Sequence, residues 1–355
     1  MKGHIRQRSP GHWAIVIDVP SPEGRRRKWH SFSGTKRDAQ KECARLITEV
    51  GKGSYVEASK ITVGEYVHSR INQWEAEGSI TARSALRYCQ LLDNQIVPHL
   101  GTKPLQKLIR LDLEGWHTAL RNGGLSARTI GAAHRLLSKA LNIAEGDGLI
   151  VKNACRAQRP PKVTENERAI VRDIRGLVEK IAGSRLYVHA IIALFTGMRL
   201  GEVLALREEH VDLNAGVIRV REALEETNAF GVRFKGTKTT AGRRDITLPA
   251  IVIETLREHR REVLETRLRL GLGKLGPQDL LFSNIEGKPL RPRNVSESWA
   301  NLAERIGLPE ITFHSLRHTH ASQLIAQGID IVTISKRLGH AGKAAAAINA
   351  ALSQW

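Results

Sequence analysis

Hydrophobic residues recur with two different periods along this chain, and the changes of period divide it into three regions. In the first region, His12–Val19 and a run that ends at Phe32 are rich in β-branched and aromatic residues, so each predicts a strand. Pro20–Gly24 predicts the turn between them. Thr35 is suited to cap a helix, and apolar residues at helical spacing continue from there to about Val50. We therefore expect a small sheet with one helix.

The second region, residues 62–152, carries apolar residues three and four positions apart almost throughout, which is the spacing of amphipathic helices. The spacing predicts four helices: Val63–Glu77, Ala82–Leu100, Leu111–Arg121 and Ala127–Glu145. The last helix has an apolar stripe made of Ile130, Leu137, Leu141 and Ala144. Off this stripe lie Arg128, Arg135 and Lys139. Such a basic face is most often only solvated, but it also suits contact with DNA.

A segment without periodicity, residues 153–169, contains Pro160 and Pro161 and predicts a linker to the third region, which mixes both periods. The helices predicted there are Tyr187–Phe195, Gly201–Leu206, Pro249–Leu270, Asn294–Ile306 and His314–Gln327. A small antiparallel sheet is predicted from Val217–Arg221, Val232–Lys235 and Asp245–Leu248. The expected fold class is multidomain and mainly α with α+β parts: a small N-terminal sheet with one helix, a helical bundle and a mixed α/β domain.

The composition is that of ordinary globular domains, with 355 residues of which 41% are hydrophobic and 26% charged. This length suits two or three domains. No apolar run approaches the length of a membrane span, and the N-terminus lacks the apolar stretch of a signal peptide. Cys43, Cys89 and Cys155 are too scattered for a disulfide framework or a CxxC metal site. These features argue against secreted, membrane and zinc-finger proteins and predict a cytoplasmic protein without a membrane partner.

The charge of the chain narrows the class of partner. Lys and Arg number 55 against 36 Asp and Glu, which gives a net charge of +19 and a pI of about 10.3. This excess predicts a polyanionic partner, most simply a nucleic acid, although basic proteins also bind membrane surfaces and ribosomes. Aromatic residues make up only 5%, which favours duplex DNA held by its phosphates over stacked single strands. A sheet that contacts DNA is suggested by four consecutive basic residues, Arg25, Arg26, Arg27 and Lys28.

The motif TGMRLGE places Arg199 directly after a glycine turn at the end of a buried apolar helix. A buried arginine at this point needs an anion, either a carboxylate or a phosphate. Glu202, three residues on, is able to steady the guanidinium from the same face. Taken alone, the motif is more typical of a structural arginine–glutamate pair.

The motif HSLRHTH places His314 and Arg317 on one helical face, so a neutral donor or acceptor lies beside a side chain that binds phosphate through two nitrogens. His314 and His318 are also four residues apart, as in some zinc sites, but the glutamate of HExxH and a cysteine partner are missing. In the motif LGH, His340 follows a helix that ends at Gly339. A lone histidine more often caps a helix or lies in the core than it binds a ligand.

Between these motifs lies a basic segment, KGTKTTAGRRDITLP, over residues 235–249. It predicts the tip of a hairpin. Lys238, or Lys235 if the register differs, is placed to reach a phosphate as proton donor, and an ordinary exposed turn lysine would give the same pattern.

Taken in order, TGMRLGE, the KGTKTTAGRRDITLP segment, HSLRHTHAS and LGHA resemble the catalytic motifs of the tyrosine recombinases, the phage integrase family. The resemblance covers nearly the whole chain. It implies that Arg199 and Arg317 bind the scissile phosphate and stabilise the negative charge that develops on it. It further implies that Lys238, or Lys235, donates a proton to the leaving 5′ oxygen and that His314 is the general acid/base. His340 would donate a hydrogen bond to the phosphate, and Glu202 would support the first arginine.

The same resemblance implies the domain roles and the partners. Residues 1–54 look like an arm-type DNA-binding domain, residues 62–152 like a helical core-site DNA-binding domain, and residues 170–355 like the catalytic domain, with 153–169 as linker. The last two domains would form a clamp around duplex DNA at attachment sites. The family reaction needs no metal and no cofactor, because a 3′-phosphotyrosyl link stores the bond energy. It runs in a homotetramer on DNA, with accessory DNA-bending proteins as further partners, in bacterial, phage or mobile-element systems.

The nucleophile of that reaction has no counterpart in this sequence. The chain has four tyrosines, which all precede Arg199: Tyr55, Tyr66, Tyr88 and Tyr187. After His340 the only hydroxyl group belongs to Ser353, in an alanine-rich tail that resembles the terminal helix found beyond the tyrosine segment in the family. Our interpretation is that the tyrosine segment is deleted; a frameshift, a truncated gene or a sequence error would give the same pattern.

Three hypotheses for the function stay open at this point. The first is a site-specific recombinase of the integrase family, impaired by the loss of its tyrosine. The second is a DNA-binding protein with an inactive catalytic domain that occupies attachment sites without cutting them. The third is a basic protein that binds metal or RNA, which the missing ligand set and the low aromatic content disfavour.

Overall fold

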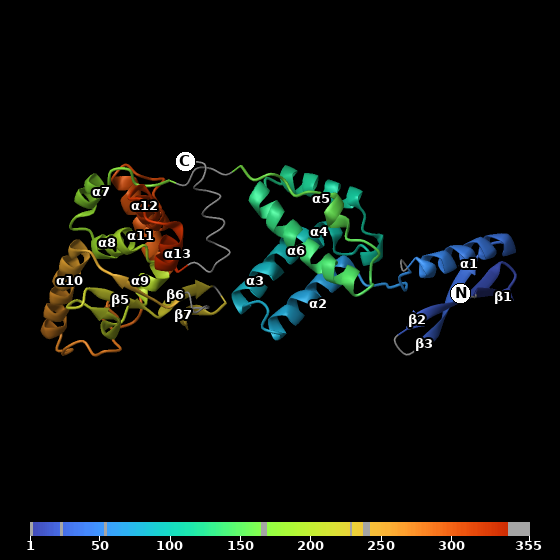
Figure 1. Ribbon diagram of the computed structural model, residues 1–355, viewed down its shortest axis with the longest axis horizontal. Helices are drawn as coiled ribbons and strands as arrows, with labels where there is room; N and C mark the ends of the chain where they lie inside the picture. The colour runs from blue at the N-terminus through green and yellow to red at the C-terminus, as the bar shows by residue number, and fades with distance from the viewer. Residues whose placement is uncertain are drawn as a thin grey trace. The chain divides into compact units, whose positions relative to one another are not determined.

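The computed structural model describes residues 3–21, 24–52, 55–164, 169–227, 229–236 and 242–339. The chain divides into two compact units, Met1–Glu165 and Asn166–Trp355 (Figure 1). Within the described residues, the first unit holds two hydrophobic cores, one beside the N-terminal sheet and one inside a helical bundle, and the second unit holds one larger core. The fold class is the mainly helical one with small sheets that the sequence predicts.

The N-terminal segment is a three-stranded antiparallel sheet in the order β1-β2-β3, and α1 packs on one face of it. These elements are β1 (Gly3–Ser9), β2 (His12–Ser21), β3 (Gly24–Ser33) and α1 (Lys36–Gly51). Ile15 and Ile17 of β2 are fully buried against the apolar side of α1. The predicted cap of α1 is confirmed, because the Thr35 hydroxyl oxygen accepts a hydrogen bond from the Asp38 backbone N–H.

Strand β1 was not predicted from the sequence, and its composition explains why. Its residues GHIRQRS are polar apart from Ile5, which lies opposite Ile15 and packs against the core. A single apolar side chain gives no alternating pattern. It is nevertheless enough for a polar strand at the edge of a sheet, whose remaining side chains face solvent.

The second core belongs to a helical bundle built from α2 (Val63–Ala76), α3 (Ala82–Leu91), α4 (Val97–Leu100), α5 (Arg110–Asn122) and α6 (Ala127–Gly146). The predicted helix over residues 82–100 is interrupted by a π-helical turn at Leu92–Ile96. Pro98 explains the interruption, since it has no N–H to donate to the preceding turn. The predicted apolar stripe of α6 is confirmed, because all four of its side chains are buried: Ile130, Leu137, Leu141 and Ala144.

The first residues of the segment predicted as a linker pack onto the bundle. Asn153 is completely buried, and its side-chain amide donates hydrogen bonds to the Ser138 carbonyl oxygen at 3.1 Å and to Asn142 Oδ1 at 2.9 Å. A short 3₁₀ turn follows at Ala154–Ala157, with Cys155 in the bundle core. The proline pair at 160 and 161 comes after this turn.

The second unit is organised around α8, which packs against α12 and α10 (Figure 1). Its helices are α7 (Ile174–Ile181), α8 (Tyr187–Thr196), α9 (Leu200–Leu204), α10 (Ala250–Arg269), α11 (Pro292–Arg305), α12 (Phe313–Ala326) and α13 (Ile331–Leu338). Its strands are β4 (Val211–Asp212), β5 (Val217–Val220), β6 (Glu222–Thr227), β7 (Gly231–Gly236) and β8 (Arg244–Thr247). Among the described helices of both units, none is both long and apolar enough to cross a membrane.

The prediction of one sheet from three strands in this unit is wrong. β5 pairs with β4 and β8, whereas β7 pairs with β6 in a separate two-stranded sheet. β6 was missed because its sequence, EALEET, contains three glutamates and does not alternate like a half-buried strand. The two strands that flank residues 237–243 therefore belong to different sheets, and the predicted hairpin is not a simple one. Lys238 lies outside the described residues.

Candidate functional site

Two glycines let the elements of the site approach one another closely. Gly197 ends α8 in the left-handed region, with a φ of 68°, and turns the chain toward α9. A Cβ on Gly197 would lie 2.5 Å from Leu338 Cδ2 and 2.7 Å from His320 Cδ2. A Cβ on Gly201 would overlap the Leu224 carbonyl oxygen of β6. Only glycine fits at both positions. Together they place the start of α9 beside β6, and the end of α8 against the middle of α12 and the end of α13.

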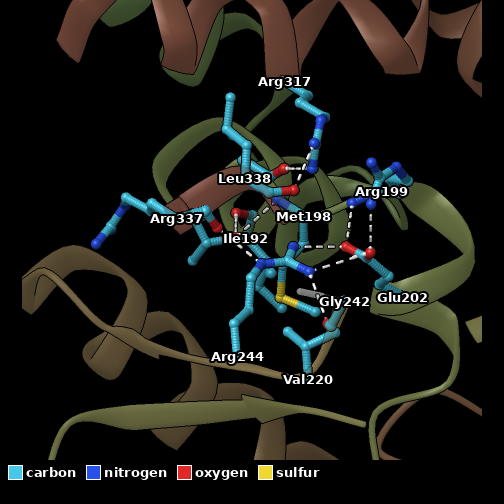
Figure 2. Close-up of polar contacts among 12 residues, drawn as sticks. Ile192, Met198, Arg199, Glu202, Val220, Gly242, Arg244, Arg317, Arg337 and Leu338 are labelled. Carbon is cyan, nitrogen blue, oxygen red and sulfur yellow. Dashed lines mark hydrogen bonds and ion pairs between the residues drawn. The ribbon is translucent and has the colours of Figure 1, made fainter. Parts of the chain in front are cut away.

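Glu202 lies at the centre of the site and is only 4% exposed (Figure 2). Its Oε2 accepts hydrogen bonds from the Arg199 backbone N–H at 2.9 Å and from Arg244 Nη2 at 2.7 Å. Its Oε1 accepts from Arg199 Nη1 at 2.8 Å and from Arg244 Nη1 at 3.2 Å. Burial alone would raise the pKa of this carboxyl, but the hydrogen bonds and charge of Arg244, with those of Arg199, lower it below its ordinary value.

The contact between Arg199 and Glu202 that the sequence predicts is therefore present. The Arg199 side chain is 42% exposed, so Glu202 holds one side of its guanidinium while part of the group remains accessible. This geometry suits an arginine that is fixed in direction and reaches an external anion.

Arg317 projects from α12 into the same cluster, and it is 3% exposed. Its Nη1 donates to the Gly197 carbonyl oxygen at 2.5 Å and its Nη2 to the Leu338 carbonyl oxygen at 2.6 Å (Figure 2). Burial, reinforced by the positive charges of Arg199 and Arg244, lowers the pKa of Arg317 to about 9. The structure thus brings together the two arginines that the motifs singled out, although more than a hundred residues separate them in sequence.

His314 is exposed on α12, three residues before Arg317, and its ring centre lies 4.5 Å from that of His318 in an edge-to-face arrangement. The spacing of His314 and His318 in the sequence is also that of some zinc sites. In the part of the chain that the structure describes, no three His, Cys, Asp or Glu side chains gather where they could hold a metal ion.

The two lysines proposed for the proton donor differ in what the structure says of them. Lys235 on β7 donates from its Nζ to Glu225 Oε2 at 2.9 Å, across the two-stranded sheet. Arg233 Nε donates to Oε1 of the same glutamate at 2.7 Å. Lys235 is thus held in a cross-strand ion pair, while Lys238 belongs to the residues that are not described.

The last predicted site residue, His340, also lies outside the described residues. The helix that leads to it is described: α13 ends at Gly339, which adopts the left-handed conformation with a φ of 67°. The predicted helix end is confirmed.

The part of the chain that forms this site is similar to known proteins. Residues 164–353, which contain every element of the cluster, match the phage integrase family. This chain belongs to that family.

Several curated relatives match this integrase over most of their length. A XerC-like tyrosine recombinase of Caldanaerobacter subterraneus is 23% identical, and the match covers 93% of this chain and 89% of the relative. A putative prophage phiRv2 integrase of Mycobacterium tuberculosis is 25% identical over 97% of this chain and 90% of its own. The tyrosine recombinase XerC of Mesorhizobium japonicum is 30% identical over 68% of this chain and 73% of its own.

Solved structures share the fold of this integrase. The Tn1549 transposon integrase, in complex with a circular intermediate DNA, is similar with a TM-score of 0.69 and 21% identity, over 79% of this chain and 92% of that chain. A lambda integrase dimer bound to a COC′ core site is similar with a TM-score of 0.58 and 19% identity, over 96% of this chain and 93% of that chain. At these identities the likeness concerns the fold alone.

Two buried residues of this integrase site were missed from the sequence. Arg244, the second arginine of GRRDITLP, binds Glu202. Its alternation with Ile246 along β8 was the signal that could have placed it on the buried side, whereas Arg243 precedes the strand. His320 is buried beside Gly197 and accepts a hydrogen bond from Arg337 Nε at 3.2 Å. Burial, with the nearby charge of Arg337, lowers the pKa of His320 to about 4.

The four basic residues proposed on the N-terminal sheet lie on two different faces. The register places Lys28 opposite Ile17, on the face covered by α1, and its Nζ lies 2.6 Å from both carboxylate oxygens of Glu57. Arg26 lies opposite Val19 and shares that face. Arg25 and Arg27 alternate to the outer face, which also carries Trp29 with 56% of its surface exposed.

Strand β1 adds two more cations to this outer face. Arg6 lies opposite Ala14 of β2, and Arg8 lies over the Trp29 ring with its Cζ 6.0 Å from the ring centre. We call this set the outer sheet face; it consists of Arg6, Arg8, Arg25, Arg27 and Trp29. Arg27 is 3.8 Å from Asp18 on the same face, at a side-chain exposure of 75%.

The predicted basic face of α6 is exposed. Arg128, Arg135 and Lys139 follow one another at intervals of seven and four residues, so they share one side of the helix, and all three are exposed. The Lys139 ammonium also lies 3.8 Å from the centre of the Trp74 ring, which holds this side chain against the bundle.

Proposed function

We propose that this chain is a site-specific DNA-binding integrase that holds a backbone phosphate of duplex DNA between Arg199 and Arg317 but does not itself cut the strand. The observation that carries the proposal is the charge of the cluster in Figure 2. Among the described residues of this cluster, the guanidinium groups of Arg199 and Arg244 bind the carboxylate of Glu202, and Arg317 lies near enough for its charge to interact with theirs. These three positive charges around one negative charge leave an excess of positive charge, which a phosphate group is suited to neutralise.

If a nucleophile were supplied, the side chains around this phosphate would take distinct parts. Charge-assisted hydrogen bonds from Arg199 and Arg317 would stabilise the negative charge that develops on the non-bridging oxygens. His314, three residues before Arg317 on α12, is suited to hold or accept a proton at the attacking oxygen. Lys238 would donate a proton to the leaving 5′ oxygen. Lys235 is less suited to this role because its ammonium group is held in an ion pair with Glu225. His340, directly after the turn at Gly339, would donate a hydrogen bond to the phosphate.

The proposed lack of strand cleavage rests on where the tyrosines are. Within residues 166–355 the sequence has one tyrosine, Tyr187. It lies in the first turn of α8, whose other end leads to Arg199. At a rise of 1.5 Å per residue the two ends of this helix are roughly 14 Å apart. The Tyr187 side chain also packs against the hydrophobic core of the unit, so we do not expect its hydroxyl to attack a phosphate bound at Arg199. The alternative is a working recombinase that uses another nucleophile.

A suicide substrate separates these two functions. The protein first selects its preferred duplex from a random-sequence library, and that duplex is then made with a nick beside each candidate scissile phosphate. We expect tight binding that is lost in high salt and no protein–DNA adduct on denaturing gels. An adduct that survives denaturation would contradict the inactive-integrase proposal, and mass spectrometry of the linked peptide would identify the nucleophile. Arg199→Ala, as the control, should weaken binding and leave no adduct.

The outer sheet face gives a second testable part of the proposal, the DNA contact of residues 1–54. We expect Arg27→Ala and Arg25→Ala each to weaken DNA binding and to reduce the slope of log affinity against log salt by about 0.9, the value for one lost phosphate contact. Lys28→Ala is the matched control, because the Lys28 ammonium is paired with Glu57 on the opposite face. An equal change of slope for Lys28→Ala and Arg27→Ala would contradict this division of the sheet.

The bundle, residues 62–152, would bind the core site through the exposed face that holds Arg128, Arg135 and Lys139. Lambda integrase has been solved as a tetramer bound to a Holliday junction. By analogy we propose that this chain also assembles as a homotetramer on its paired sites, where accessory DNA-bending proteins would act.

A further inference from the structure

Arg244 has no assigned contact with the phosphate, yet its guanidinium makes four hydrogen bonds in the cluster of Figure 2. It is the first residue of β8, and its side chain is 6% exposed. Nη2 and Nη1 donate to the two oxygens of Glu202 at 2.7 and 3.2 Å. Nε donates to the Arg337 carbonyl oxygen at 2.7 Å, and Nη1 also lies 3.4 Å from the Gly242 carbonyl oxygen. The guanidinium thus joins the start of β8 to two segments that are remote in sequence.

The first of these segments is the start of α9. The pair with Arg244 holds both oxygens of Glu202 in the direction that Arg199 needs, because the same two oxygens accept the Arg199 backbone N–H and Nη1. Without Arg244, the Glu202 carboxylate would be held by Arg199 alone. The Glu202 carboxylate and the Arg199 guanidinium bound to it would then both be freer to move, so the direction of Arg199 toward a ligand would be less well fixed.

The second segment is the C-terminal end of α13. Its last two carbonyl groups, those of Arg337 and Leu338, accept hydrogen bonds from Arg244 and Arg317 respectively. Carbonyls at a helix C-terminus lack partners within the helix and carry a partial negative charge, so cations are favourable there. Arg244 therefore fixes the end of α13 next to the carbonyl that Arg317 binds.

We propose that Arg244 is a positioning residue of the phosphate site: it fixes the direction of Arg199 through Glu202 and fixes the end of α13, without itself contacting DNA. Its burial behind Glu202 keeps it from the ligand. The inference rests on the proposed function, because it assumes that Arg199 binds a phosphate. A lysine could not replace it fully, since one ammonium group cannot reproduce the planar fork that spans both oxygens of Glu202 and the Arg337 carbonyl.

A double-mutant cycle tests whether Arg244 acts through Arg199. The affinity of the full chain for its selected duplex is measured for the parent, Arg199→Ala, Arg244→Met and the double variant. We expect Arg199→Ala to weaken binding about tenfold and Arg244→Met about three- to tenfold, with Arg244→Met weakening the Arg199→Ala background by clearly less than its full factor. Arg244→Lys should fall between the parent and Arg244→Met.

Arg221 provides a matched control on the neighbouring part of the sheet. It directly follows β5, and its Nη2 pairs with Asp245 at 2.7 Å rather than with Glu202. Arg221→Met should change the affinity for the duplex by the same factor in the parent and in the Arg199→Ala background. Hydrogen exchange adds a second readout: the last turn of α13 should exchange faster in Arg244→Met and remain unchanged in Arg221→Met.

The outcomes separate this inference from the proposed function. If Arg199→Ala binds the duplex as tightly as the parent, the proposed phosphate site is wrong, and the Arg244 role falls with it. If Arg199→Ala weakens binding but Arg244→Met weakens the Arg199→Ala background by its full factor, only the positioning role is overturned. If Arg244→Met does not fold, the same cycle is run with Arg244→Lys and with Glu202→Gln/Arg244→Met, which also removes the buried carboxylate charge. The positioning role is overturned if either variant weakens DNA binding by the same factor with and without Arg199→Ala.

Discussion

Glu202→Ala is expected to reduce the free energy of unfolding of the second unit by about 3–5 kcal/mol, the cost of removing one partner from a buried charge network. The substitution would leave Arg244, with its side chain 6% exposed, and Arg317, at 3% exposure, without the carboxylate that offsets their charge. Both guanidinium groups would then carry uncompensated positive charge in a site from which water is largely excluded. Glu202→Gln should cost less, because the amide keeps the volume of the side chain and one acceptor oxygen.

The measurement is urea unfolding of the full chain, followed by hydrogen exchange in α8 and α12 so that the second unit is observed by itself. Glu225→Ala serves as the control. Glu225 also binds two cations, Arg233 and Lys235, but those side chains are 38% and 28% exposed and can return to water. A loss for Glu202→Ala that is no larger than that for Glu225→Ala would show that the network does not stabilise the unit.

This network was only partly predictable from the sequence. Arg199 and Glu202 are three residues apart and lie in one motif, so local spacing was enough to pair them. Arg244 comes 42 residues later, at the start of β8, which the sequence correctly places in a sheet with β5 but wrongly also with β7. Its partner could not be found without knowing that Gly201 allows α9 to lie directly against β6. Local periodicity carries no information about such a contact.

In the N-terminal sheet, the alternation of residues along β3 was more informative than the basic run itself. The run Arg25–Lys28 was treated as one basic patch, but alternation along β3 divides it between two faces. The buried Ile15 and Ile17 on β2 already indicated which face is inward, so that division could have been predicted once β2 and β3 were paired. Strand β1, with a single inward apolar side chain, offered no such signal.

Acidification between about pH 6.5 and pH 4 is expected to destabilise both units, because each contains a buried histidine that is neutral in the folded protein. Burial lowers the pKa of His134 in the bundle and of His320 in the second unit to about 4, from an ordinary value of 6.5. A histidine whose pKa is lower when folded stabilises the protein fully above pH 6.5. That contribution is lost as the pH falls toward 4, since the unfolded chain takes up the proton first.

The expected loss of stability is large relative to the stability of a domain. A difference of about 2.5 between the ordinary and the folded pKa of one histidine corresponds to roughly 3 kcal/mol in the free energy of unfolding, once the pH has fallen below both values. The contact between His134 Nδ1 and His117 Nε2, at 3.2 Å, explains why the bundle is sensitive. One ring must be unprotonated to accept that hydrogen bond, and protonation of both would place two positive charges together in the core between α5 and α6.

His134→Gln is expected to remove the contribution of His134 to this pH dependence and to leave that of the buried His117, at some cost in stability at neutral pH, with the acid sensitivity of the second unit unchanged. Urea unfolding between pH 7.5 and pH 4.5, followed by hydrogen exchange in α6 and α12, measures the two units separately. His68, which is exposed on α2, provides the control, since His68→Gln alters no buried contact and should leave both profiles as they are. If the bundle of His134→Gln still loses stability in acid as the parent does, the pair between α5 and α6 is not the group that takes up the proton. Faster exchange in α6 than in the parent already at pH 7.5, with a smaller further change on acidification, is the pattern expected when one histidine of a neutral buried pair has been replaced by a side chain that cannot be charged.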